Sequence, residues 1–153
     1  MVDIKTPLVP IRMSAEAPTP TRTHAKILQH ELVMDEPESR HGTGLGPTPL
    51  DTLVAALAGC TNVVLNRIAE ENGIEVRGLS LDLRSRLDVR GIRGIEEIDR
   101  PLRRIDLRIK FETTAEADKV ELLRSQLNRR CAVSVIFREA GIEVNETWDV
   151  SHV

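Results

Sequence analysis

The feature that most constrains the fold is an apolar, alanine-rich segment over residues 49–71. Thr48 stands at the N-cap position and Asp51 follows three residues later, which is a capping box with Asp in place of the usual Glu or Gln. Apolar side chains then recur at helical spacing, and Gly73 supplies the left-handed residue that ends a helix. The pattern predicts one long helix whose inward positions are Leu53, Leu57, Cys60, Val64 and Ile68.

Small residues fill the positions between these apolar side chains, among them Ala55, Ala56 and Gly59. Because small side chains let another backbone approach closely, we expect this helix to be central and nearly surrounded by protein. The chain has 153 residues, a length typical of one domain. We therefore expect a single domain over 1–153, with an N-terminal arm or edge strand over about residues 1–20, where half of the prolines lie.

Alternating apolar and charged residues predict strands in the rest of the chain. We expect one or two strands over 21–35, with Ile27 and Val33 pointing inward. Further strands are expected over 74–89, 103–112 and 142–150, and further helices over 115–130 and 131–141. These elements group antiparallel strands around two or three helices, which is an α+β domain rather than a βαβ array.

Composition argues against several partners. The formal net charge is −3 and aromatic residues make up 2% of the chain, so nucleic acid is not an expected partner. No stretch approaches the roughly 20 apolar residues of a membrane-spanning helix, and the first residues do not resemble a signal peptide. We therefore expect no membrane association and a cytoplasmic protein.

Motifs for metals and bound cofactors are also missing from the sequence. The four histidines form neither HExxH nor a CxxC-containing zinc pattern, so no metal is expected. The loop GTGLGPTP over 42–49 precedes the long helix but lacks the dinucleotide fingerprint and the P-loop Gly-Lys-Ser/Thr. We interpret it as a flexible turn and expect no bound cofactor.

Two cysteines, Cys60 and Cys131, carry the remaining chemistry. Without a secretory context, such a pair is more often catalytic, redox-active or metal-binding than a structural disulfide. Cys60 by itself fits a buried core thiol. Cys131 follows Arg129 and Arg130 at the start of a predicted helix, a position that favours the reactive thiolate. Residue chemistry alone leaves a redox pair and two core cysteines equally open.

Two segments carry a resemblance to a known family. GPTPLDTLVAALAGCTNVVL resembles the cysteine-bearing central helix of the OsmC/Ohr superfamily, the osmotically inducible protein C and organic hydroperoxide resistance proteins. RRCAVSVIFREAGIEVNETWDV is similar to its second cysteine helix and closing strand, and MDEPESRHGTGLGPTP to a loop of the less characterised OsmC-like branch. The resemblance covers about residues 24–150. It implies an intertwined homodimer in which antiparallel sheets wrap around two central helices, with active sites at the dimer interface.

The resemblance also implies an activity, since characterised members are thiol peroxidases. Carried onto this chain, Cys60 is the peroxidatic cysteine and Cys131 the resolving one. A hydroperoxide converts Cys60 to a sulfenic acid, and Cys131 condenses with it to a Cys60–Cys131 disulfide. An external dithiol, such as a dihydrolipoyl group, restores both thiols. An apolar pocket between subunits favours organic hydroperoxides.

The chain departs from the peroxidase pattern at three places. Leu50 stands where those members have a Glu, and Asp51 beside it is either a helix cap or a catalytic carboxylate. The arginine that activates the cysteine corresponds to Arg40 in one branch and to Arg22 in another. Ala132 replaces the proline after the second cysteine.

Two alternatives to the peroxidase stay open. One is a non-enzymatic OsmC-like protein that binds a small apolar or thiol ligand at the dimer interface, with the cysteines sensing redox state. The other is a scaffold in which Cys60 and Cys131 are core residues without redox chemistry.

Overall fold

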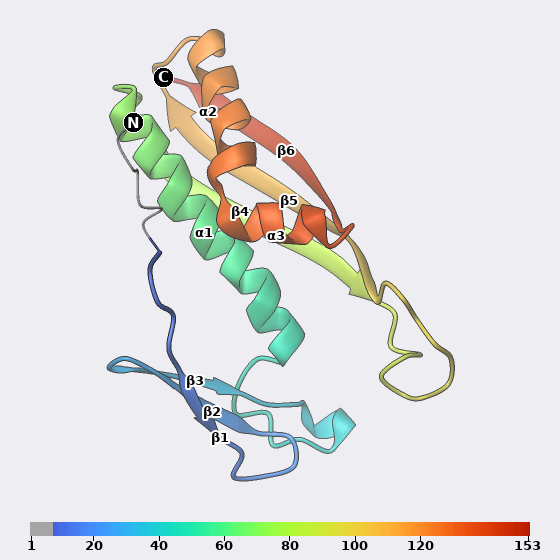
Figure 1. Cartoon of the computed structure of the whole chain (residues 1–153). Coiled ribbons are helices and arrows are strands. Elements are labelled where there is room, and N and C mark those ends of the chain that lie inside the picture. The colour runs from blue at the N-terminus through green and yellow to red at the C-terminus, as the bar shows by residue number, and fades with distance from the viewer. Residues whose placement is uncertain (1–7) are drawn as a thin grey trace, which may run out of the picture. The chain divides into compact units, whose positions relative to one another are not determined.

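The computed structural model describes residues 8–153 as two compact units, which divide after Leu53 and are described separately (Figure 1). The first part of the expected N-terminal arm, residues 1–7, lies outside the described residues. Unit 1 contains β1 (Ser14–Glu16), β2 (Thr23–Ile27), β3 (His30–Met34), the 3-10 helix η1 (Glu38–Arg40) and the start of α1 (Pro49–Glu71). Unit 2 contains the rest of α1, β4 (Arg77–Leu87), β5 (Leu102–Thr113), α2 (Ala117–Arg130), α3 (Ala132–Glu139) and β6 (Glu143–His152).

Unit 1 is an antiparallel sheet in the order β1-β2-β3. Two strands, β2 and β3, lie within residues 21–35, where one or two were predicted, and β1 is an edge strand, as expected. Ala25 is fully buried, and Ile27, two residues further along β2, lies on the same face and is half-buried. The predicted inward position of Val33 is wrong, and this residue too is only half-buried. The register pairs Ala25 with Leu32, so Val33 lies on the opposite face of the sheet from Ala25.

Unit 2 contains a sheet in the order β4-β5-β6. The antiparallel pairing of β4 with β5 confirms the predicted antiparallel arrangement for these two strands. The expectation of purely antiparallel strands is wrong for the last strand, because β6 runs parallel to β5 and places Val144 beside Ile105 and Trp148 beside Ile109. A parallel neighbour needs a crossover connection, and α2 and α3 supply it. The fold is therefore α+β with one crossover unit inside it.

The long helix has the predicted bounds. α1 spans Pro49–Glu71, and the chain leaves it through Gly73 at φ 61°, in the left-handed region. At its N-terminus the Asp51 amide donates to Thr48 Oγ1 at 3.2 Å, and the Thr48 amide donates to Asp51 Oδ2 at 3.2 Å. This reciprocal pair is the predicted capping box.

The buried face of α1 differs from the prediction. Leu53 is 45% exposed, and Cys60 and Val64 are only half-buried. The buried positions are instead Leu57, Thr61, Leu65, Ile68 and Ala69. Small residues on the other side, including Ala55 and Gly59, are exposed. The expectation that protein nearly surrounds the helix is therefore wrong for the described chain, which covers one face of it.

The same helix bears on the prediction that the chain does not associate with a membrane. At 23 residues, α1 is long and apolar enough to cross a membrane, and 28% of its most apolar window is buried inside the chain. A core helix of a soluble protein passes the same test, so one such helix is weak evidence for a membrane segment. The absence of membrane association stays a prediction.

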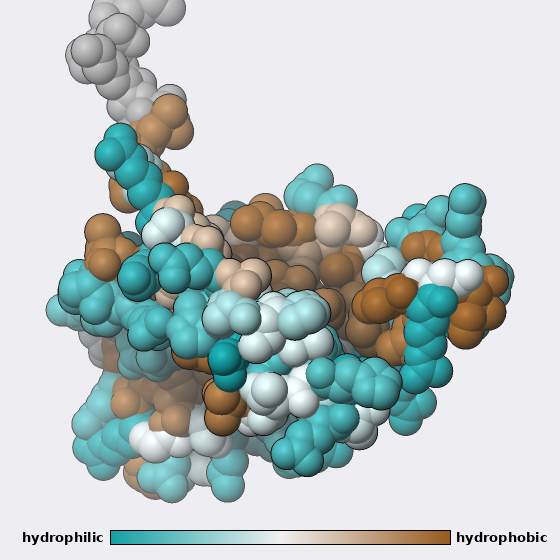
Figure 2. All heavy atoms as spheres, turned by 90° about the horizontal axis from the view of Figure 1, so that it is seen from below, coloured by the Kyte–Doolittle hydropathy of each residue, from teal (hydrophilic) through white to brown (hydrophobic). Residues whose placement is uncertain are grey.

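The core of unit 2 lies between its sheet and its helices, which cover the same side of the sheet (Figure 1). Alternate residues of β5 are buried there, and Phe111 meets Trp148 edge to face at 6.1 Å between ring centroids. The loop between β4 and β5 leaves this core. It exposes Ile92 and Ile95, and Figure 2 shows its hydrophobic side chains at the right-hand edge among hydrophilic ones.

Candidate functional site

The fold brings the two cysteines together inside unit 2. Cys60 projects from the middle of α1 and is half-buried, and Cys131 is fully buried between α2 and α3. Both are free thiols, and the Cys60 side chain lies near enough to the Cys131 thiol to raise its pKa. Two cysteines that are far apart in the sequence are therefore neighbours in the fold.

Backbone geometry fixes the position of Cys131. Its amide donates to the Leu127 carbonyl at 2.9 Å, which closes α2, and its carbonyl accepts from the Val135 amide at 3.0 Å, which opens α3. Cys131 itself is extended, at φ −74° and ψ 98°. Because one residue ends one helix and starts the next, the change of direction between the helices occurs at Cys131.

The environment of Cys131 favours its neutral thiol. Burial, above all, and next the neighbouring Cys60 side chain together raise the pKa of the Cys131 thiol to about 11. The Ser134 amide and the Thr61 hydroxyl, which lie toward the sulfur, lower that pKa by less than burial raises it. At neutral pH the proton stays on Cys131.

This result contradicts the prediction that Cys131 is a thiolate beside two arginines. Arg130 forms a two-pronged ion pair with Glu71, with nitrogen–oxygen distances of 2.6 and 2.8 Å. Arg129 donates to the Ser125 carbonyl at 3.3 Å. Both guanidinium groups point to other acceptors, and burial decides the charge state of the thiol.

Two polar residues at the site were missed by the sequence analysis. Thr61 is 1% exposed and Ser134 is 3% exposed, and Ser134 Oγ has no hydrogen-bond partner among the described residues. Thr61 follows Cys60 directly, and Ser134 comes one helical turn after Cys131. The sequence did contain a signal for both residues, because each is a hydroxyl-bearing residue that follows a cysteine closely within a mainly apolar segment.

Asp51 serves as the partner of the helix cap. Besides the backbone pairing, its Oδ2 accepts a hydrogen bond from the Thr48 hydroxyl at 2.6 Å. Its carboxylate is exposed at the start of α1, whereas Cys60 lies in the middle of the same helix. The capping prediction is confirmed, and a catalytic role for Asp51 stays a prediction. Leu50, which stands in the place of the family Glu, is half-buried.

The two candidate arginines belong to unit 1. Arg40 ends η1, and its Nε donates to Glu36 Oε2 at 2.5 Å on the surface. Arg22 lies just before β2, and its Nη1 donates to Thr43 Oγ1 at 3.3 Å. Each therefore has an acceptor within its own unit, and activation of Cys60 by either stays a prediction.

Metal ligands do not gather in the part of the chain that the structure describes. Residues 8–153 contain no group of three or more His, Cys, Asp or Glu side chains placed to hold an ion. The site therefore consists of two neighbouring thiols, two buried hydroxyl groups and the apolar core around them.

Fold and site together define an α+β protein with a pair of free, neighbouring cysteines. The family model described as OsmC-like protein matches residues 42–147, which is more than half of the chain. The chain belongs to the OsmC-like family, as the sequence resemblance predicted. Comparison with curated proteins finds no match.

Solved structures share the fold at low sequence identity. An OsmC-like protein from Mycoplasma pneumoniae superposes with a TM-score of 0.80 at 18% identity, covering 94% of this chain and 99% of that one. Organic hydroperoxide resistance proteins from Legionella pneumophila and Elizabethkingia anophelis give TM-scores of 0.63 and 0.65 at 17% and 14% identity. The Legionella comparison covers 95% of this chain and 99% of that one, and the Elizabethkingia comparison 98% and 100%. At these identities, the likeness establishes the fold alone.

Proposed function

We propose that this protein is a cysteine-based thiol peroxidase that reduces organic hydroperoxides. The observation that carries the proposal is the proximity of the Cys60 and Cys131 thiols within unit 2. A resolving cysteine must reach the oxidised sulfur, and proximity in the reduced protein shortens the movement that this requires. Some structural neighbours are named organic hydroperoxide resistance proteins, which supports the same chemistry at the level of the family.

The two cysteines have different tasks in this proposal. The Cys60 thiolate attacks the outer peroxide oxygen, the O–O bond breaks, and the products are a Cys60 sulfenic acid and an alcohol that takes up a proton. Cys131 then attacks the Cys60 sulfur, and water leaves as the disulfide forms. An external dithiol, such as a dihydrolipoyl group, reduces the disulfide and becomes a disulfide itself.

The difference in environment matches this division. Cys60 is half-buried and accessible from one side, whereas Cys131 is buried and holds its proton. A buried neutral thiol does not compete for the peroxide, because the thiolate is the nucleophile. In this scheme Cys131 acts only after Cys60 has been oxidised, and its proton leaves with the oxygen as water.

The homodimer and the cytoplasmic location are part of the same proposal. The exposed side of α1 carries small residues, including Ala55, Ala56 and Gly59, on which a second copy of the chain can pack closely. Such packing would cover the open side of the Cys60 helix with apolar surface, which favours organic over inorganic peroxide. Light scattering should then give twice the chain mass.

Rapid mixing of the reduced protein with cumene hydroperoxide, and separately with hydrogen peroxide, tests the proposal. We expect fast loss of two thiols per chain, preference for the organic substrate, and a Cys60–Cys131 disulfide in the peptide mass map. Cys60→Ser should abolish peroxide consumption. Cys131→Ser should retain one rapid oxidation but stop at the sulfenic acid, which a dimedone probe traps.

The result that overturns the proposal is persistence of both thiols through minutes of excess peroxide. In that case Leu50, in the place of the family Glu, is the first position to change, and Leu50→Glu should gain activity if the cysteine pair is competent. A small apolar or thiol ligand that copurifies without turnover would instead favour the non-enzymatic binding protein. If the thiols of the folded protein also resist alkylation, the cysteines are core residues.

A further inference from the structure

A second candidate site lies on unit 2, away from the cysteines. The hairpin of β4 and β5 carries a cleft with a volume of about 550 Å³. Its lining consists of four arginines, two aspartates, a serine and a proline, which are Arg84, Arg86, Arg103, Arg104, Asp88, Asp106, Ser85 and Pro101. Volumes of 300–1,000 Å³ are usual for small-molecule sites, so the cleft is large enough for a metabolite.

Both aspartates of the cleft already have partners, Asp88 in Arg90 and Asp106 in Arg104, which itself lines the cleft. Asp88 Oδ2 accepts from Arg90 at 2.7 Å, and the Arg90 backbone amide donates to Asp88 Oδ1 at 3.1 Å. Asp106 Oδ1 is 2.6 Å from an Arg104 nitrogen and accepts from Asn145 at 2.9 Å. These contacts lower the pKa of both carboxyl groups, that of Asp88 to about 2. Both carboxylates therefore stay negatively charged and bound to these donors.

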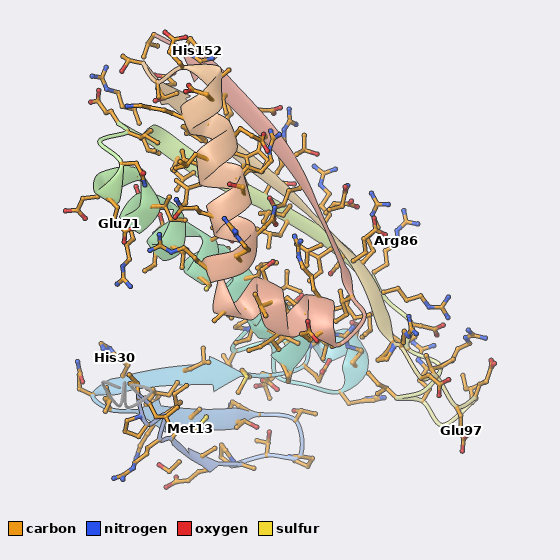
Figure 3. The ribbon with its side chains drawn as sticks, turned by 45° about the horizontal axis from the view of Figure 1, so that its top comes forward. Met13, His30, Glu71, Arg86, Glu97 and His152 are labelled. Atoms are coloured by element: carbon orange, nitrogen blue, oxygen red, sulfur yellow. The ribbon has the colours of Figure 1, made fainter. Side chains whose placement is uncertain are left out.

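The remaining arginines of the cleft have unused donors. Within residues 8–153, Arg86 and Arg103 have no carboxylate within ion-pair distance, and both are exposed. Arg84 pairs with Asp82 at 3.0 Å, but its side chain is 82% exposed, so a ligand can displace that contact. Figure 3 shows Arg86 projecting outward from the hairpin. The chain as a whole is negative, so this local excess of positive charge is unusual for it.

We propose that this cleft binds a small ligand bearing a phosphate or diphosphate group. The planar guanidinium of arginine donates two parallel hydrogen bonds, a geometry that matches phosphate oxygens. Arg86 and Arg103 would supply these donors, and Pro101 would give an apolar wall for the organic part of the ligand.

The cleft is independent of the thiol site, because none of the residues that line it is Cys60, Cys131 or one of the residues that affect the Cys131 thiol. Ile105 and Leu107 of β5 point into the core that contains Cys131, whereas Arg104 and Asp106 alternate with them and point outward. Failure of the peroxidase proposal therefore leaves this one intact, and the reverse also holds.

Calorimetric titration of the full chain with sodium pyrophosphate tests the proposal. We expect saturable binding, and at least a tenfold rise in Kd for the double variant Arg86→Gln/Arg103→Gln. Arg129→Gln/Arg12→Gln is the control, since it removes the same charge at exposed positions outside the cleft. It should change Kd by less than twofold. All substituted side chains are exposed, and circular dichroism checks that each variant folds.

A second arm separates a soluble ligand from a lipid headgroup. The same proteins are sedimented with vesicles of phosphatidylcholine, with and without phosphatidic acid. Binding to either pyrophosphate or the phosphatidic acid vesicles, lost in the cleft variant alone, supports the site and identifies the source of the phosphate. Binding to neither probe overturns the proposal. An equal loss in the control variant also overturns it, because net charge and not the cleft would then be responsible.

Discussion

The two units of this protein are organised around opposite kinds of centre. Unit 2 has a continuous apolar core, in which β5 alone buries Ile105, Leu107, Ile109 and Phe111. Among residues 8–53 of unit 1, the fully buried side chains are those of Ala25 and of a carboxylate, Asp35. The first unit is therefore organised by polar contacts, and the second by exclusion of water from apolar surface.

Asp35 is the centre of the polar unit. Its oxygens accept hydrogen bonds from the Thr43 hydroxyl, from the Thr43 amide at 3.1 Å and from the Glu36 amide at 2.8 Å. The Leu45 amide adds a longer contact at 3.4 Å. The loop that looks like a flexible turn in the sequence is thus wrapped around one carboxylate. In unit 1, therefore, the buried Asp35 carboxylate holds in place a loop that has few apolar residues.

The largest expected loss of stability follows from a substitution in the apolar core of unit 2. Phe111→Ala should destabilise the protein by about 3–5 kcal/mol, because it leaves a cavity in the core and removes the contact with Trp148. Urea unfolding measures the loss, and amide hydrogen exchange locates it. Lys110→Ala, on the exposed face of the same strand, should cost less than about 0.5 kcal/mol. Equal losses in the two variants would contradict an apolar core at this position.

In unit 1, stability should depend strongly on the close packing of the backbone in the loop around Asp35. A Cβ at Gly42 would stand 1.7 Å from the Glu36 carbonyl oxygen, so Gly42→Ala must displace the loop around Asp35. We expect a loss of about 1–3 kcal/mol, as for other substitutions that overpack a site. Hydrogen exchange should increase first at the Thr43 and Leu45 amides. Ser39→Ala, exposed in the same loop, is the control and should leave exchange unchanged.

The buried carboxylate also makes unit 1 sensitive to acid. Hydrogen bonds from Thr43 hold the pKa of Asp35 far below its usual value. A depressed pKa contributes stability that is fully present above the unfolded value, near 3.9, and is lost as the pH falls below it. Asp35→Asn should therefore be less stable at pH 7 and show a weaker loss between about pH 4 and pH 2. Thermal unfolding across this range measures both effects, and parallel curves for the two proteins would refute the assignment.

The stability contributed by the Cys131 thiol should depend on pH in the opposite direction. Because the pKa of the Cys131 thiol is raised to about 11, the folded state keeps this proton while the unfolded state loses it near pH 8.5. Its contribution to stability is present below that value and declines as the pH rises toward 11. In the native protein at pH 8, iodoacetamide should label Cys60 at least about tenfold faster than Cys131. Equal labelling rates, measured by peptide mass, would show that Cys131 is not buried.

The smallest effect is expected at the start of α1. Thr48→Ala removes the N-cap side chain that contacts Asp51, and should cost about 1 kcal/mol. If Asp51 acts only through this cap, Asp51→Asn should retain the rate of thiol oxidation by cumene hydroperoxide. A large fall in that rate at unchanged stability would instead give Asp51 a catalytic role.

Local sequence patterns predicted most elements and the buried face of β5, but not the buried face of α1. The bounds of α1 follow from a cap, a proline and a glycine that act within one helical turn, so no distant residue is needed to place them. Its buried stripe could not be obtained in the same way. Thr61 is buried and Leu53 is exposed, because the sheet and the other helices cover only one side of α1, and nothing in the helix itself specifies which side.

The sequence by itself determined that Cys60 and Cys131 are the candidate redox residues, where apolar and charged residues alternate as strands, and where the helices begin and end. The strands and the helix ends depend only on neighbouring residues. Tertiary structure decided the rest. It made β6 parallel to β5, through a crossover that hydropathy does not encode. It also brought Cys131 against Cys60 and buried it, which reversed the charge state expected from the adjacent arginines. Desolvation depends on everything packed around an atom, so no local pattern could show that the thiol would keep its proton.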